Sequence, residues 1–574
     1  MLFGWLTRLL SIGQFYLDML KFLKENLAII LLVIGAFAIR VLFVTEVPPS
    51  LNWDEVSHGF NAYSILKTGK DEWGERLPTI FRAYGDYKLP AYIYLTAISE
   101  LFFGVTDFAV RFPSVLAGSM TVLFSYLLIE KITKKKLLAF LTAFFVAIEP
   151  WSFFLSRIAV EANLSLFFVV AGAYFFFLGI EKKSWKILLS SFFWGMSLWT
   201  YNSARIFTPL LVFSFFLIYR RQIVKIFKIK KFLVISYFLL ATFFLVPMLF
   251  QFLSSNALAR FEKVTILDEG AIANIGLLQT NFFLPYPFSR LVVNKLTYFL
   301  KEFFSNYFSY FSLDFLFLKG GSQYQFSVGE FGVLYLINLP FWFLGLFTIL
   351  FRLRKDSSLQ SLAVWLLLAP IPASLVREAP HVLRSILILP IPMFLVAVGL
   401  MEIRKRIKFR FLTYFYLFFL ICNIFLYGRE LFTNYRKNYS WVWQYGYRQV
   451  VTYLKENYQK YDLIIVSKKY GEPHEFLLFY WPWEPERYQN DPNLVRFYQS
   501  GWFWVDGFDK FVFVNDWDIP RDGFLFITEK KLKFDCSGQR CLLVTSPSNN
   551  PVGWKYLDSV LFLNNQKAFE IYEN

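Results

Sequence analysis

Long apolar blocks alternate with short loops rich in lysine and arginine between residues 26 and 428. The blocks approach or reach the roughly 17–25 residues that a helix needs to cross a bilayer. The pattern predicts an α-helical polytopic membrane protein with about eleven transmembrane helices. We expect these spans at 26–44, 108–130, 137–155, 162–180, 187–201, 204–219, 232–252, 331–351, 358–376, 382–402 and 411–428.

The basic loops predict the orientation of the chain. The clusters run from Lys131 to Lys136, Lys182 to Lys186, Arg220 to Lys231, Arg352 to Lys355 and Arg404 to Arg410. Because such loops are kept on the cytoplasmic side, we expect the loops 45–107 and 253–330 and the tail 429–574 on the outer face. A span at residues 88–104 would place the later basic loops on the outer side. We therefore expect this segment, which contains Pro90 and Glu100, to form an interfacial or re-entrant helix.

The tail is predicted to be an extracytoplasmic α/β domain. Apolar runs at 461–470, 510–517, 523–530 and 541–546 alternate with turn signals, and a helical pattern covers 447–458. Cys536 and Cys541 are close enough in sequence for a local disulfide. At the other end, residues 1–25 read as an amphipathic segment without a signal-peptide cleavage site.

Composition agrees with a multi-pass protein of the cell membrane. Hydrophobic residues make up 56% of the 574 residues and charged residues 18%, against about 45–50% and about 25% in soluble domains. An ordinary soluble enzyme is therefore excluded. The net charge of +17 would suggest a nucleic-acid partner in a soluble protein. Here the basic loops account for it, so membrane lipids rather than nucleic acid are the expected partners.

Ionisable residues gather at the outer ends of the predicted spans. They are Asp54, Glu55, Lys88, Glu161, Arg205 and Arg384. A channel or proton-coupled transporter would place such groups near the bilayer midplane. The pattern favours an active site at the outer interface instead, because Lys and Arg bind phosphate and a carboxylate can deprotonate a hydroxyl nucleophile.

Three motifs carry a resemblance to a known family. They are PPSLNWDEVSHG, GDYKLPAY and RFPSVLAG, in this order. The chain thereby resembles the GT-C glycosyltransferase superfamily, in particular the protein O-mannosyltransferase-like enzymes and the bacterial aminoarabinose transferase branch. The resemblance covers about 26–220, extends weakly to 330–428 and does not reach the tail. It implies a GT-C-like transmembrane domain over 26–428. It also implies an inverting transfer of a sugar from a polyprenyl-phosphate donor to a hydroxyl of a protein, lipid or glycan acceptor.

The resemblance also assigns roles to the acidic residues. Asp54 is implied to be the general base, and Glu55 beside it is counted with it among the catalytic residues. Glu161 is implied to place the acceptor or a metal. A divalent metal ion is left open, and the lipid-linked donor is a substrate rather than a cofactor. The three histidines lack the spacing of metal ligands: His58, His381 and His474.

The basic residues are implied to bind the phosphate of the donor. Lys88 matches the phosphate-contacting lysine of the family and Arg384 its late arginine, and Arg205 is a further candidate. The family has two prolines after the lysine, whereas Leu89 replaces the first of them here.

Several alternatives remain open at this stage. The same scaffold could transfer an oligosaccharide or a lipid-linked glycan, and the chain could also be a lipid transporter or an inactive scaffold. Asp54 and Glu55 could cap a helix, and Arg157 could pair with Glu161 one turn later. Four tryptophans of the tail either stack on sugars or form its core, the second being favoured: Trp441, Trp443, Trp481 and Trp483.

Overall fold

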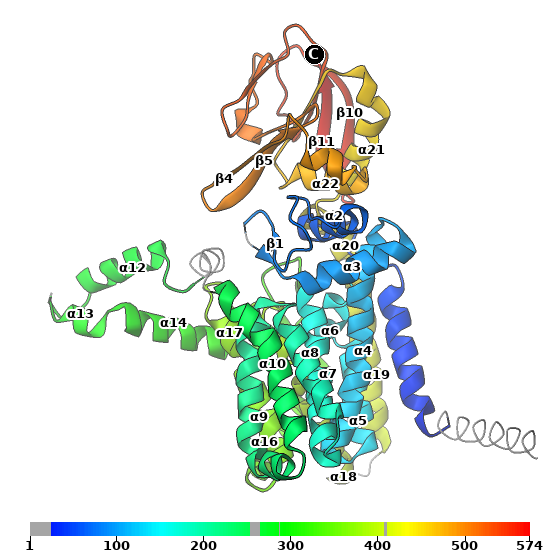
Figure 1. Cartoon of the computed structure of the whole chain (residues 1–574), viewed down its shortest axis with the longest axis vertical. Helices are drawn as coiled ribbons and strands as arrows, with labels where there is room; N and C mark the ends of the chain where they lie inside the picture. The colour runs from blue at the N-terminus through cyan, green and yellow to red at the C-terminus, as the bar shows by residue number, and fades with distance from the viewer. Residues whose placement is uncertain (1–23, 86, 253–264, 286, 407–409) are drawn as a thin grey trace, which may run out of the picture.

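The computed structural model describes residues 24–85, 87–252, 265–285, 287–406 and 410–574. The predicted amphipathic segment 1–25 lies almost entirely outside these residues, and so does the first part of the predicted loop 253–330. Figure 1 shows a bundle of helices, a sheet domain above it and a helical arm that projects from one side.

Each predicted span contains a helix. The bundle comprises a helix over 24–41 and α4 (Asp107–Thr133), α5 (Lys136–Ile148), α7 (Glu161–Lys182), α8 (Lys186–Leu198), α9 (Asn202–Ile229), α10 (Lys231–Phe252), α15 (Leu339–Arg352), α16 (Ser357–Leu368), α17 (Pro370–Ser374), α18 (Ile391–Arg406) and α19 (Arg410–Arg429). Several helix ends differ from the predicted spans, among them the start of α15 at Leu339 instead of 331. Helix α9 continues through its basic segment to Ile229, and α18 begins only after Pro390, which lacks the N–H needed inside a helix.

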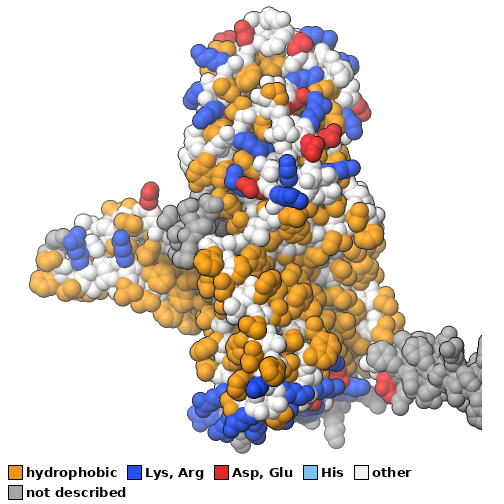
Figure 2. All heavy atoms as spheres, viewed as in Figure 1, with side chains coloured by type: hydrophobic (Ala, Val, Ile, Leu, Met, Phe, Trp, Pro, Cys, Tyr) orange, Lys and Arg blue, Asp and Glu red, His pale blue; other side chains and the backbone are white. Residues whose placement is uncertain are grey.

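The apolar surface of the bundle is that of a membrane protein. Among the described residues, five helical segments are long and apolar enough to cross a membrane: Asp107–Thr133, Glu161–Lys182, Lys231–Gln251, Ser357–Ser374 and Phe411–Asn438. Three shorter apolar helices accompany them, so the number of about eleven spans stays a prediction. In Figure 2 apolar side chains cover the visible face of the bundle, and Lys and Arg side chains gather at the end opposite the sheet domain.

Helices α2 (Trp53–Thr68) and α3 (Pro90–Phe103) lie between the bundle and the sheet domain (Figure 1). A capping box begins α2: the Asn52 side chain accepts a hydrogen bond from the Glu55 N–H, and the Glu55 carboxylate accepts one from the Asn52 N–H. Pro90 occupies the first turn of α3, where its missing N–H costs nothing. Leu101 and Phe102 are exposed on α3, which fits the interfacial helix expected over 88–104.

The upper domain is built on a mixed sheet. Its strands are, in spatial order, β10 (Lys555–Leu561), β11 (Lys567–Glu573), β9 (Cys541–Thr545), β3 (Leu463–Ser467), β6 (Phe511–Val514), β5 (Trp502–Phe508) and β4 (Val495–Gln499). Strand β3 is parallel to β6 and β9, and the other pairs are antiparallel. The predicted runs at 461–470, 510–517 and 541–546 contain β3, β6 and β9. The run at 523–530 contains β7 (Leu525–Ile527), which pairs with β8 (Lys533–Asp535) in a separate sheet.

Each face of the large sheet has its own core. Ile464 and Val466 pack with α21 (Tyr447–Asn457) and α22 (Pro473–Tyr480), and the same cluster includes Val56 of α2. The sheet domain and α2 therefore share one hydrophobic core. Trp483 is buried in this cluster, which confirms the core interpretation for it, whereas Trp443 is buried in the hydrophobic cluster of the helical bundle.

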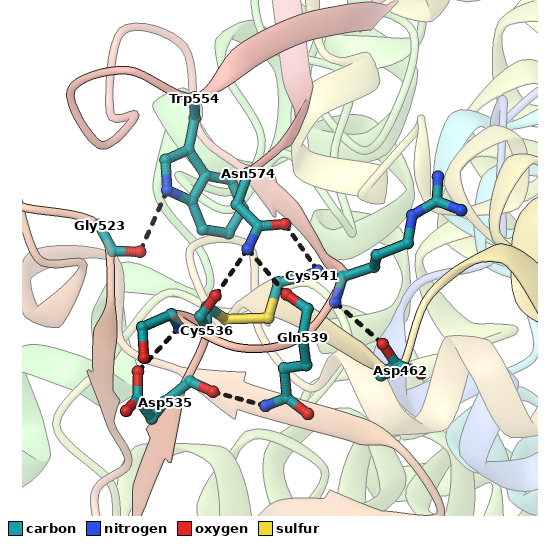
Figure 3. The surroundings of a disulfide bond; sticks show 10 residues. Asp462, Gly523, Asp535, Cys536, Gln539, Cys541, Trp554 and Asn574 are labelled. Atoms are coloured by element: carbon teal, nitrogen blue, oxygen red, sulfur yellow. Dashed lines mark hydrogen bonds between the residues drawn. A yellow bond between two sulfur atoms is a disulfide. The ribbon is translucent and has the colours of Figure 1, made fainter.

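The opposite face of the sheet is closed by the predicted disulfide. Cys536 and Cys541 are joined by an S–S bond, and both lie in the cluster that includes Ile465 and Trp554. Figure 3 shows that the Asn574 side chain spans this bridge, donating to the Cys536 carbonyl at 2.7 Å and accepting from the Cys541 N–H at 2.9 Å.

The remaining elements connect these parts. The arm consists of α12 (Glu269–Thr280), α13 (Ser289–Val292) and α14 (Lys295–Ser309), and a β-hairpin of β1 (Phe81–Arg82) and β2 (Tyr87–Lys88) precedes α3. Short helical segments are α6 (Pro150–Leu155), η1 (Asp314–Leu318), η2 (Leu336–Asn338), η3 (Leu353–Lys355), η4 (Ile386–Ile388), η5 (Glu430–Tyr435), α20 (Arg436–Asn438), η6 (Ser440–Trp443), η7 (Tyr458–Lys460), α23 (Pro485–Gln489) and η8 (Asp516–Asp518).

Candidate active site

A polar cavity of about 260 Å³ lies where α2, β2 and the beginnings of α7 and α9 meet. Five of the six predicted site residues line it: Asp54, Glu55, Lys88, Glu161 and Arg384. Segments that are far apart in the sequence thus bring carboxylates and cations into one space. Neutral polar side chains complete the wall, among them Asn52, Asn202, Gln323 and Gln325.

Asp54 and Lys88 form an ion pair across the cavity, with the Lys88 Nζ 2.8 Å from the Asp54 Oδ1. Asp54 lies in the first turn of α2, directly after the capping box, and Lys88 ends the β1–β2 hairpin. The Asp54 side chain is 35% exposed and that of Lys88 14%. A substrate therefore has access to the carboxylate, while the ammonium group is held close beside it.

Glu55 has a different environment from its neighbour. Its carboxylate is 1% exposed and accepts two hydrogen bonds from Arg111 of α4, each of 2.9 Å. The N–H groups of Ala159 and Asn52 donate to the same carboxylate at 2.7 and 3.1 Å. These contacts are those of a residue that holds α2, α4 and the start of α7 together, and they support the helix-capping alternative for Glu55.

Glu161 is the first residue of α7 and pairs with a histidine. The His58 Nε2 lies 3.2 Å from the Glu161 Oε1, and the His58 side chain is 1% exposed. Arg157, by contrast, donates to backbone carbonyls at the end of the first helix, including those of Ile39 and Val47. His58 was not predicted as a partner of Glu161. The available signal was its position one helical turn after Asp54, which places both on one face of α2.

Arg384 enters the cavity from the loop before α18. Its guanidinium is 3.2 Å from the Glu378 carboxylate, and its side chain is 24% exposed. His381 lines the same wall, where burial and the adjacent Arg384 lower the pKa of the imidazole to about 3. The histidine is therefore neutral at ordinary pH, and Arg384 is the cationic group of this loop inside the cavity.

Arg205 is the one predicted site residue that lies outside the cavity lining. It is buried in α9, where its guanidinium donates to the Leu198 carbonyl at 3.0 Å and to the Gln251 Oε1 at 2.7 Å. These contacts join α8, α9 and α10. The geometry thus offers no support for phosphate binding by Arg205, because its described bonds fix the bundle.

The described residues give no direct indication of a metal site. In the described ranges, no group of three or more His, Cys, Asp or Glu side chains is arranged to hold a metal ion. What the cavity offers chemically is an accessible carboxylate, a second acidic group oriented by histidine, and two cations. Such a set suits an anionic substrate together with a hydroxyl group that must lose a proton.

Comparisons with known proteins agree with the resemblance drawn from the sequence. Residues 88–250 match the family model described as dolichyl-phosphate-mannose-protein mannosyltransferase. The search of curated protein sequences finds no match.

Among solved structures, ArnT from Cupriavidus metallidurans bound to undecaprenyl phosphate has a TM-score of 0.55 at 11% identity, covering 96% of this chain and 98% of that one. Its apo state has a TM-score of 0.51 at 10% identity, with the same coverage. The fold is therefore that of ArnT, a bundle of apolar helices with a C-terminal sheet domain.

A third similar structure is the archaeal oligosaccharyltransferase AglB from Archaeoglobus fulgidus, in complex with an inhibitory peptide and a dolichol-phosphate. It has a TM-score of 0.46 at 13% identity, covering 80% of this chain, and the chain spans 64% of its length. With the family match and the ArnT fold, the predicted resemblance to the GT-C glycosyltransferases is confirmed.

Proposed function

We propose that the protein is an inverting glycosyltransferase that moves a sugar from a polyprenyl-phosphate donor to a hydroxyl acceptor at the outer face of the cell membrane. The observation that carries this proposal is the cavity in which Asp54, Lys88, Glu161 and Arg384 meet. The match of residues 88–250 to a family named for a dolichyl-phosphate-mannose donor supports the class of substrate.

Asp54 acts as the general base in this proposal. The acceptor oxygen attacks the anomeric carbon, the bond from that carbon to the phosphate oxygen breaks, and the acceptor proton moves to the Asp54 carboxylate. A phosphate leaves without protonation when cations stabilise its charge, so one carboxylate is enough. A single displacement of this kind inverts the anomeric configuration.

Lys88 and Arg384 receive the phosphate. The ammonium group already lies 2.8 Å from Asp54, so a phosphate bound to it places the anomeric carbon near the base. Arg384 lines the same cavity and adds a planar donor that suits phosphate oxygens. Both cations face charge that grows as the phosphate leaves.

Glu161 places the acceptor rather than the donor. Its contact with His58 at 3.2 Å holds the carboxylate in one orientation, from which it can accept a hydrogen bond from an acceptor hydroxyl. Glu55, buried against Arg111, supports Asp54 from behind and takes no proton.

The orientation follows from charge and from the disulfide. Lys and Arg gather at the end of the bundle away from the cavity (Figure 2), as expected of cytoplasmic loops. The Cys536–Cys541 disulfide is typical of an oxidising, extracytoplasmic compartment. Both support a chain of about eleven spans whose cavity and C-terminal domain, residues 429–574, lie outside.

Turnover of radiolabelled donors by the purified protein tests the proposal. We expect one polyprenyl-phosphate sugar of a panel to be hydrolysed or transferred, and Asp54→Asn to lower turnover by about 10²–10⁴-fold, the range of general-base catalysis. Asp314→Asn is the matched control, because that carboxylate is 59% exposed outside the cavity. Turnover only of a pyrophosphate-linked oligosaccharide would favour an oligosaccharide transferase, and no turnover of either kind would favour a transporter or scaffold.

A further inference from the structure

The backbone beside the proposed base is held by the C-terminal domain. Trp53 immediately precedes Asp54, and its N–H donates to the Gln444 Oε1 at 3.1 Å. The Gln444 amide in turn donates to the Tyr470 carbonyl at 3.1 Å. At the next residue, Gly471, a Cβ atom would lie 2.2 Å from the Trp53 ring, so the indole fills the space against this loop completely.

The hairpin that carries Lys88 is held by the same domain. The Phe503 N–H of β5 donates to the Tyr84 carbonyl at 2.6 Å, and the Trp502 ring stacks on the Tyr84 ring with centroids 6.0 Å apart. A Cβ atom on Gly85 would lie 2.3 Å from Trp502. Strand β5 and the hairpin are thus in contact along both backbone and rings.

These two contacts are joined to each other. The Tyr84 hydroxyl donates to the Trp53 carbonyl, which links the hairpin to the residue before the base. On the domain side, the Trp502 Nε1 donates to the Glu472 Oε1 at 2.6 Å, and Glu472 follows Gly471 in the chain. Together these hydrogen bonds and ring contacts form one network around the backbone segments that carry Asp54 and Lys88.

We propose that Gln444 and Trp502 are positioning residues that set the distance between the Asp54 carboxylate and the Lys88 ammonium group. This inference rests on the proposed function and gives the C-terminal domain a part in the reaction itself. Neither residue touches the substrate. Gln444 acts through Trp53 on the base, and Trp502 acts through Tyr84 on the hairpin that presents Lys88.

The two residues are expected to affect different steps. Misplacing a reacting group by about 1 Å costs about 10²-fold in rate, so Gln444→Ala should lower kcat by about tenfold to a hundredfold and change the donor KM little. Trp502→Ala loosens the phosphate-binding hairpin and should raise the donor KM. A domain that only recognised the acceptor would leave donor hydrolysis without acceptor unchanged in both variants.

Conservative variants separate positioning from folding. Gln444→Glu keeps the oxygen that accepts from Trp53 but loses the donation to the Tyr470 carbonyl, and Trp502→Phe keeps a ring over Tyr84 but loses the donation to Glu472, so each should recover part of the activity lost by the alanine variant. Trp517→Ala is the matched control, because this tryptophan is 81% exposed on the same domain. Hydrogen exchange at the Trp53 amide provides a readout apart from activity and should accelerate in Gln444→Ala alone.

The outcomes distinguish the two proposals. A wild-type protein that turns over no donor overturns the proposed function. A wild-type protein that turns over donor, loses this activity in Asp54→Asn and keeps its kcat in Gln444→Ala overturns the positioning role alone. A fall in kcat that Gln444→Glu partly reverses, at unchanged melting temperature, supports it.

Discussion

Replacement of Glu55 by glutamine should unfold the protein at a lower temperature, although the change is nearly isosteric. In the native state each of the two carboxylate oxygens accepts two hydrogen bonds, one from Arg111 and one from a backbone N–H. Glutamine keeps one oxygen but turns an NH₂ group toward two donors, the Arg111 Nη2 and the Asn52 N–H. Two hydrogen bonds and the counter-charge of a fully buried guanidinium are lost together.

The size of the effect follows from burial. Glu55 and Arg111 are 1% and 0% exposed, and removing one partner of a buried ion pair costs about 3–5 kcal/mol. A loss of this size corresponds to a melting temperature lowered on the order of 5–10 °C. Asp54→Asn, at a side chain 35% exposed, should leave the melting temperature within about 1–2 °C, because exposed ion pairs contribute about 0–1 kcal/mol.

Tryptophan fluorescence during heating in detergent measures these shifts, since the chain has 17 tryptophans. Glu181→Gln is the control, because Glu181 is 52% exposed and pairs with two lysines on the surface. If Glu55→Gln melts at the temperature of Glu181→Gln, the structural role is wrong and Glu55 becomes a candidate for catalysis again.

Three further predictions concern other parts of the molecule. Burial together with the neighbouring Glu72 raises the pKa of Glu475, so its contribution to stability is present below the ordinary carboxyl pKa and is lost as pH rises. The melting temperature should therefore fall between pH 5.5 and pH 8, and Glu475→Gln should reduce this fall; an undiminished fall would contradict it. Arg384→Gln should raise the donor KM about tenfold or more through loss of a charge-assisted hydrogen bond, and an unchanged KM would remove Arg384 from the phosphate site. Cys536→Ser opens the short loop closed with Cys541 and should destabilise the C-terminal domain by about 2 kcal/mol, as should a reducing agent; denaturant titration that shows no change would refute this.

The meeting of the cavity residues could be predicted because a membrane restricts how a chain is arranged. Once the spans alternate in direction, residues at every second turn must lie at the same end of the bundle. Asp54 and Lys88 share the first outer loop, Glu161 and Arg384 stand in two later outer turns, and all four line one cavity. Arg205 also stands at such a turn, yet its side chain points to Gln251. Topology therefore predicts the end of the bundle, while the direction of a side chain depends on helix rotation.

Other features depend on contacts that no local pattern reports. Gln323 and Gln325 line the cavity but lie in a polar loop without a charged motif. Strand β10 was missed because it places polar residues at many positions, as in KYLDSVL, and an edge strand needs only one apolar face. Strand β5 was missed for a different reason: its aromatic residues contact the β1–β2 hairpin, which is distant in the sequence. These elements are determined by their partners in space.

The Asp-Glu pair shows why a motif identifies a site before it identifies roles. Successive residues of an α-helix point about 100° apart, so the side chains of Asp54 and Glu55 point in different directions although both border the cavity. Asp54 faces the cavity and Lys88, whereas Glu55 faces Arg111 in the packed interior. One residue can then exchange a proton with a substrate while the next fixes the helix that carries it. Two adjacent carboxylates of equal appearance in the sequence thereby have separate roles, and the partner of each decides which role it has.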